Sequence, residues 1–246
     1  EDVYGSNLND HIYGNVETNY LFGRGGADYI SSGEGGDDFI DAGSGDDFIS
    51  LHLAGGHQIV DGGEGNDEIS FAPAPGSQQA AANTPGVRVD LAATGMQEVM
   101  EDVFVTITSI EEVTGTAGND TIFGSAGVNI LAGGEGDDRF VFRAGDTSST
   151  TGSIDRINDF TSADDSISFG FAATATNYAE IGGGTYAQAL NDATALINGG
   201  QRDIIAVQVG ADVYVFADIS STNIVTGTVH LYGVTLAGVE QTDFVA

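Results

Sequence analysis

Aspartates that follow glycines at a fixed spacing are the residues of this sequence best suited to chemistry. Residues 133–141 read Gly-Gly-Glu-Gly-Asp-Asp-Arg-Phe-Val, with a carboxylate at the sixth position and a large apolar residue at the eighth. Residues 62–70 repeat this pattern, and residues 115–123 repeat it with one glycine replaced. Carboxylates and nearby glycine carbonyl groups offer oxygen ligands, which suit a hard divalent cation. Calcium accepts six to eight such ligands in a flexible geometry, so this set favours calcium over magnesium.

The same spacing runs through the first seventy residues. The apolar eighth positions, at steps of nine or ten, are Ile12, Leu21, Ile30, Ile40, Ile49, Ile59 and Ile69. No helix or plain strand has this period. A unit that begins with glycines and ends near a β-branched residue predicts a tight turn followed by a short strand. Units of this kind stack into a solenoid.

The sixth positions separate into two series if two nonapeptides complete one coil. Alternate repeats then lie directly above one another. The acidic ladder consists of Asp10, Asp28, Asp47 and Asp67, and the mixed ladder consists of Asn19, Asp38 and His57. We therefore expect well-filled ion sites along the acidic ladder. His52 and His57 have no third nitrogen or sulfur ligand beside them, so a degenerate repeat is favoured there over a zinc site.

A second block carries the sixth-position residues Asp120, Asn129 and Asp138, of which the two aspartates would share one edge. With this block the chain resembles the RTX proteins, the hemolysin-type calcium-binding repeat family. The resemblance implies a mainly β fold, a right-handed parallel β-roll, with several calcium ions between stacked turns. It also implies side-chain ligands at the sixth positions and carbonyl ligands at the turn glycines. Leu8 and Glu17 depart from the glycine pattern in the outer repeats.

The candidate ligands are Asp10, Asp28, Asp38, Asp47, Asp67, Asp120 and Asp138 through their side chains, and Gly25, Gly35, Gly43, Gly45, Gly63, Gly65, Gly118, Gly134 and Gly136 through their carbonyl oxygens.

The charge balance is strongly acidic, with 37 acidic against 6 basic residues and a formal net charge of -31. Such a charge argues against nucleic acid and against an anionic membrane surface as partners. The sequence also has no apolar run long enough to predict a transmembrane segment. Because the acidic groups repel one another, we expect the chain to be disordered without calcium and to fold when cations neutralise them.

Four segments are predicted along the chain. They are 1–71, a first RTX block; 72–114, a loop and wider solenoid coils; 115–142, a second RTX block; and 143–246, an α+β C-terminal capping and secretion-signal region. The loop is Ala72–Gly86, which holds all three prolines, and the wider coils contain strands at 87–91 and 103–107. Glu1 leads almost directly into the first repeat, so we expect a fragment of a longer protein.

The last segment contains two predicted capping strands, at 154–160 and 164–169. Their acids Asp155, Asp159, Asp164 and Asp165 could add a further ion, but the interpretation as solvated turn residues is favoured. Apolar residues on one face predict a helix over 185–198, stopped by Gly199 and Gly200. A hairpin of residues 204–209 and 213–216 and a strand at 229–234 follow. The ending 243–246 resembles the uncleaved tails that the type I secretion apparatus recognises. Its removal is expected to abolish export and leave folding nearly intact.

Catalytic motifs are missing from the sequence: it has no H-E-x-x-H, no G-x-S-x-G and no cysteine. We therefore predict no enzyme activity in this chain. The leading hypothesis is a calcium-dependent folding and export module, secreted or at the cell surface of a bacterium. The alternatives are a structural or adhesive module of a surface-layer or biofilm protein that self-associates with calcium, and an appended module of a secreted protease, lipase or polysaccharide-modifying enzyme.

Overall fold

The computed structural model describes residues 1–72 and 84–246. Its contacts divide the chain into two compact units: unit 1 is Glu1–Ile122 with Gly133–Glu135, and unit 2 is Phe123–Ala132 with Gly136–Ala246. Of the predicted loop Ala72–Gly86, residues 73–83 lie outside the described part of the chain. The prediction of four segments stays a prediction.

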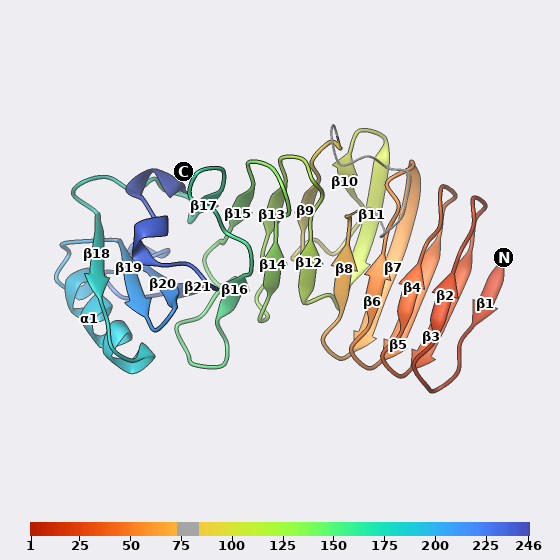
Figure 1. Cartoon of the computed structure of the whole chain (residues 1–246), viewed down its shortest axis with the longest axis horizontal. Helices are drawn as coiled ribbons and strands as arrows, with labels where there is room; N and C mark the ends of the chain where they lie inside the picture. The colour runs from red at the N-terminus through yellow and green to blue at the C-terminus, as the bar shows by residue number, and fades with distance from the viewer. Residues whose placement is uncertain (73–83) are drawn as a thin grey trace. The chain divides into compact units, whose positions relative to one another are not determined.

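Unit 1 is built from short parallel strands that follow one another as successive coils (Figure 1). One parallel series contains β1 (Asp2–Tyr4), β3 (Tyr20–Gly25), β5 (Phe39–Ser44), β7 (Gly56–Glu64) and β11 (Val103–Thr108), and β10 (Gln97–Met100) pairs antiparallel with β11. The other series contains β2 (His11–Tyr13), β4 (Tyr29–Ser31), β6 (Phe48–Ser50), β8 (Glu68–Ser70) and β12 (Glu112–Thr114). Successive repeats alternate between the two series, so two nonapeptides make one coil.

The apolar residue of each repeat is buried, which gives the coils their common core. Leu21, Ile30, Ile40, Ile49 and Ile69 have no measurable exposure. Each lies opposite its counterpart in the neighbouring strand of the same series, as Ile30 does with Ile49. The solenoid predicted from the nine-residue period and the parallel β-roll implied by the resemblance are therefore both confirmed.

One repeat was assigned in the wrong register. Val60, and not Ile59, lies opposite Ile40. Val60 is 1% exposed, whereas Ile59 is 39% exposed. The residue in line with Asp38 is consequently Gln58, so His57 does not belong to the mixed ladder. The turn before β7 is longer than in the other repeats, and a count in steps of nine or ten cannot detect the extra residue.

Residues 84–122 extend unit 1. β11 pairs with β7 and β12 pairs with β8, so these two strands form a further coil. β9 (Arg88–Asp90) neighbours β13 (Thr121–Phe123), and the amide of Thr121 donates to the carbonyl of Val87 at 2.8 Å.

Unit 2 continues the same architecture over two strand series. β14 (Ile130–Ala132), β16 (Asp155–Ile157) and β21 (Gly227–Leu231) are parallel neighbours, as are β15 (Arg139–Val141), β17 (Ser166–Ser168) and β22 (Phe244–Val245). The predicted capping strands are thus another coil and do not close the roll. Residues far along the chain, in β21 and β22, stack on that coil.

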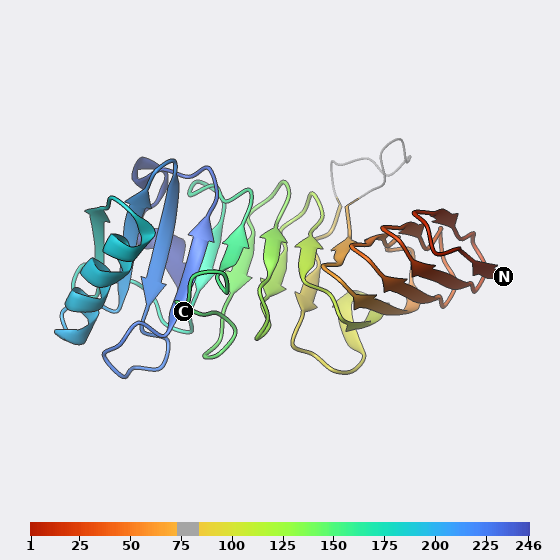
Figure 2. The same ribbon diagram turned by 90° about the horizontal axis from the view of Figure 1, so that it is seen from below.

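The α+β part of unit 2 agrees with its prediction. Helix α1 (Tyr186–Asn198) is capped by Thr185, and its residues Ala189, Ala193 and Ile197 are fully buried. They pack on Ile205, Val207 and Phe216 of the hairpin formed by β19 (Ile204–Val209) and β20 (Asp212–Ala217). β18 (Tyr178–Gly182) pairs with β19, and α1 lies along these strands (Figure 2). In the described residues, no helix is long and apolar enough to cross a membrane.

The C-terminal tail is part of this folded unit, which corrects the expectation that its removal leaves folding nearly intact. Two short helical turns, η1 (Leu236–Gly238) and η2 (Gln241–Asp243), lead into β22. Phe244 is 2% exposed. Its ring lies 6.4 Å from that of Phe169 and 5.3 Å from that of Tyr178. A tail this well packed contributes to stability.

Candidate calcium-binding turns

The carboxylates of the acidic ladder reach from coil to coil. In each pair, a backbone amide donates to the Oδ1 atom of the ladder aspartate one coil later. The distances are 2.8 Å from Asp10 to Asp28, 2.7 Å from Asp28 to Asp47 and 2.9 Å from Asp47 to Asp67. Asp67 donates in the same way to the Oε2 atom of Glu111, at 3.0 Å. One oxygen of each of these carboxylates thereby ties two coils together.

The second oxygen of most of these carboxylates accepts no hydrogen bond from the described residues. The Oδ2 atoms of Asp28, Asp38, Asp47 and Asp67 are buried and have no hydrogen-bond partner in the described part of the chain. A buried charged oxygen without a partner is strongly unfavourable, and native structures satisfy nearly all such atoms. These atoms are therefore candidates to bind a cation.

The carbonyl groups of the turns lie close to the turns stacked on them. A Cβ atom added to Gly45 would lie 1.9 Å from the carbonyl oxygen of Gly26, and one added to Gly65 would lie 2.0 Å from that of Gly45. Both glycines have positive φ, 125° and 143°. Only glycine fits this conformation and this approach without strain. Carbonyl oxygens and unpartnered carboxylate oxygens thus occur together in the same turns.

The predicted carbonyl ligands fall into three groups. Gly43, Gly45, Gly63, Gly65, Gly134 and Gly136 all have positive φ and occupy the expected turn positions. The pairing of Arg24 with Gly43 shifts two predictions by one residue: Gly26, and not Gly25, is in line with Gly45. By the same spacing from Asp38, Gly36 takes the place of Gly35. Gly118 is not left-handed, and its Cβ position would lie 2.1 Å from the carbonyl oxygen of Thr84.

Three acidic residues belong to the ladders although the sequence interpretation missed them. Asp155 is fully buried and accepts the amide of Asn129 at 2.8 Å, and Asp165 accepts the amide of Asp138 at 3.1 Å. Glu111 takes the place of an aspartate after Asp67. All three stand two residues before a buried apolar residue, as the repeat aspartates do. This spacing was the available signal, and the interpretation of Asp155 and Asp165 as solvated acids was wrong.

Burial shifts the acid–base properties of the ladders. It raises the pKa of Asp47 and of Asp67 to about 6, with repulsion from neighbouring carboxylates adding to the shift. Burial likewise raises the pKa of Asp155 to about 7 and raises that of Asp38. The pKa of Asp10 is lowered instead, because the amide and hydroxyl of Ser6 donate to its carboxylate. In the residues described, no three His, Asp or Glu side chains converge on one point, so a bound cation would need carbonyl ligands as well.

The mixed ladder supplies donors of its own. The amide nitrogen of Asn19 donates to the Oδ1 atom of Asp38 at 3.0 Å and to the carbonyl oxygens of Asn15 and Glu17. That of Gln58 donates to the carbonyl oxygen of Gly36 at 3.0 Å. In both side chains the atom that faces these acceptor oxygens must be the amide nitrogen, because the amide oxygen cannot donate a hydrogen bond. Along this edge, side-chain amides occupy places beside the turn carbonyls.

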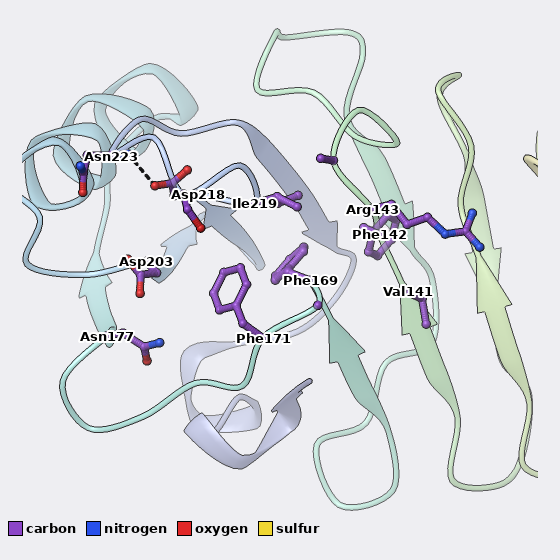
Figure 3. A pocket seen from close by; sticks show the side chains of 13 residues that line it. Val141, Phe142, Arg143, Phe169, Phe171, Asn177, Asp203, Asp218, Ile219 and Asn223 are labelled. Atoms are coloured by element: carbon purple, nitrogen blue, oxygen red, sulfur yellow. Dashed lines mark hydrogen bonds between the residues drawn. The ribbon is translucent and has the colours of Figure 1, made fainter.

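A pocket in unit 2 is a different kind of feature. Phe169 and Phe171 lie at its centre, and Asp203 and Asp218 lie to one side (Figure 3). The two carboxylate oxygens of Asp218 accept the backbone amides of Thr222 and Asn223, at 3.0 and 2.6 Å. The carboxylate of Asp218 therefore holds its own loop in place.

The repeats also match a known family. A family model described as the RTX calcium-binding nonapeptide repeat matches four copies, at residues 4–37, 32–53, 54–70 and 110–147. This chain carries RTX calcium-binding repeats. RTX repeats bind calcium and are typical of secreted bacterial proteins. No curated protein matches the sequence.

Two solved structures that are similar to this chain have low sequence identity to it. The extracellular lipase LipA from Serratia marcescens is 17% identical with a TM-score of 0.31, and the alignment covers 100% of this chain and 40% of the lipase. The AlgE6R3 subunit of the Azotobacter vinelandii mannuronan C5-epimerase is 18% identical with a TM-score of 0.29, over 98% of this chain and 80% of the subunit. The fold assignment rests on the strand pairing of this chain itself.

Proposed function

We propose that this chain is a calcium-binding module that folds on calcium and thereby supports type I secretion and extracellular stability of a larger protein. The observation that carries the proposal is the row of buried Oδ2 atoms on Asp28, Asp47 and Asp67 without a hydrogen-bond partner among the described residues. Each belongs to a turn with carbonyl oxygens directed at its neighbour. Oxygen ligands of this kind fit calcium.

The ligand set would combine side chains and backbone. Asp28, Asp47 and Asp67 would provide carboxylate oxygens, and the turn residues before them would provide carbonyl oxygens. Bound calcium would supply the positive charge that these oxygens lack. Asp138 follows Gly134 and Gly136 in the same motif and would act in the same way in unit 2. These ions would also offset part of the net charge of -31.

Calcium would act as a folding ligand. One repeat buries a single large apolar side chain, which is a small gain against the loss of backbone entropy when nine residues become ordered. A site with calcium at a hundred times its dissociation constant adds about 2.7 kcal/mol. Several sites would therefore decide whether unit 1 folds.

This dependence suits export from a bacterium. A chain that stays unfolded at low cytoplasmic calcium can pass a narrow exporter, and weak sites then fill outside the cell. The exporter would read the C-terminal region in the unfolded chain, because Phe244 is buried once unit 2 has formed. RTX repeats are typical of secreted bacterial proteins, which agrees with this route.

The test is a calcium titration of the chelator-treated chain, followed by circular dichroism and light scattering together, with magnesium as the control. We expect a cooperative gain of β structure at constant mass, and no such gain with magnesium. Growth in mass together with the β signal would instead favour a surface-layer or adhesive module that self-associates. Complete β structure in chelator would overturn the calcium proposal.

A further inference from the structure

The turns of the ladders differ in whether the ladder side chain accepts hydrogen bonds from its own turn. The difference depends on the residue four positions before that side chain. In four turns where that residue is Ser or Thr, its backbone amide and its hydroxyl both donate to the ladder side chain. The pairs are Ser6 with Asp10, Thr116 with Asp120, Ser125 with Asn129 and Thr161 with Asp165. The four amide distances lie between 2.6 and 2.7 Å. We call these the closed turns.

The other turns lack this arrangement. Arg24, Gly43 and Gly63 stand four positions before Asp28, Asp47 and Asp67. All three are left-handed, with φ of 80°, 109° and 101°, whereas none of the Ser and Thr residues of the closed turns has positive φ. The carboxylates that follow them keep a buried Oδ2 atom without a partner in the described chain. We call these the open turns.

The backbone explains the difference. With ordinary φ, the amide of the turn residue faces the carboxylate, and the nearby hydroxyl adds a second donor. Two such hydrogen bonds to a charged acceptor satisfy it without an ion. In the left-handed conformation that donor is absent, and the carbonyl oxygens of Arg24 and Gly43 instead face the next turn, 2.3 and 1.9 Å from where a Cβ would be. The buried Oδ2 atoms of Asp28, Asp47 and Asp67 therefore lack the two donors that the closed turns supply, and a bound cation would take the place of those donors.

We infer that the residue four positions before a ladder side chain decides whether that turn takes calcium: a Ser or Thr whose amide and hydroxyl both donate to the side chain closes the turn, and a left-handed residue opens it. This inference rests on the proposed function. It assigns calcium to the turns of Asp28, Asp47 and Asp67, and to that of Asp138, which follows the left-handed Gly134. It removes Asp10 and Asp120 from the ligand set. Two residues fit neither form: Asp38, which follows Glu34, and Asp155, which follows Thr151 and keeps a buried Oδ2 atom without a hydrogen-bond partner among the described residues.

The experiment converts a closed turn into an open one. Thr116→Gly restores the two-glycine motif before Asp120, and the number of calcium ions bound per chain is measured by equilibrium dialysis with metal analysis on the full chain. We expect one more ion than in the wild type. Thr116→Ser keeps both donors and should bind the wild-type number. Thr161→Gly, before Asp165, makes the same change in unit 2 and should also add one ion.

Asp47→Ala separates the two proposals. If it binds fewer ions than the wild type while Thr116→Gly and Thr161→Gly fold and bind the wild-type number, the inference about the turn residue is wrong and the calcium module stands. If the wild-type chain binds no calcium, the proposed function itself fails. Should Thr116→Gly not fold in saturating calcium, the Thr161→Gly count decides.

Discussion

The acidic and mixed ladders of unit 1 have almost the same backbone and different chemistry. The side chains of both ladders precede short parallel strands, each with one buried apolar residue per repeat. On the acidic ladder, Asp47 and Asp67 each keep one buried oxygen without a partner in the described residues. On the mixed ladder, the amides of Asn19 and Gln58 donate to turn carbonyls. The comparison teaches that an amide at the sixth position supplies donors to the turn carbonyls, whereas a carboxylate there must be satisfied by donors or charge from elsewhere.

The largest loss of stability is expected from a substitution in the apolar core of unit 2, away from the ladder residues. Phe244→Ala removes a buried ring that contacts Phe169 and Tyr178, and should destabilise unit 2 by about 3–5 kcal/mol. Chemical denaturation in saturating calcium measures this loss. The calcium count should stay that of the wild type. A lower number of bound calcium ions would show that ion binding depends on this apolar packing.

The second effect compares the two ladders directly. Asp47→Ala removes one proposed ion site and the acceptor of the Asp28 amide, so it should raise the calcium midpoint of folding and cost about 3 kcal/mol in saturating calcium. Asn19→Ala removes no charge and should shift the midpoint less. Calcium titrations followed by circular dichroism measure both. Equal shifts would contradict the separate roles of the ladders.

A smaller effect is expected from an isosteric change. Asp47→Asn places an amide where the carboxylate lies, as Asn19 does on the other edge, and should remove one bound ion. Because the amide is neutral, the chain should form more β structure in chelator than the wild type does. Circular dichroism in chelator and metal analysis test this. Less β structure than in the wild type would show that an amide cannot take over the role of the ion.

The smallest effect is the response to pH without calcium. The pKa of Asp47 and of Asp67 is raised to about 6 in the folded state, so the folded chain binds protons that the unfolded chain has released. Stability of the calcium-free chain should therefore be greatest below about pH 4 and fall as the pH rises through 6. Circular dichroism in chelator at several pH values, which follows the β structure gained at low pH, measures this. Asp47→Asn should flatten the profile, and stability that increases with pH would contradict the burial of these groups.

Much of the fold follows from local patterns. Each repeat carries its own turn glycines and its own buried residue, so the spacing of Ile30, Ile40 and Ile49 predicts coils without knowledge of distant contacts. Helix α1 is also local, with Thr185 before it and Gly199 after it. The register of Val60 was missed because an inserted turn residue leaves the apolar pattern nearly unchanged. The packing of Phe244 was missed because its partners lie far away in the sequence.

The sequence by itself determined the order of carboxylates and amides along each ladder, because these depend on side-chain identity at a fixed spacing. It also determined the excess of acidic over basic residues, 37 against 6, from which calcium-dependent folding was predicted. Only the tertiary structure decided which oxygen of each carboxylate is satisfied. That outcome depends on the sign of φ four residues earlier and on the amide of the coil before, as the contrast of Asp47 with Asp165 shows. Hydrogen bonds between stacked coils exist only after the coils have met.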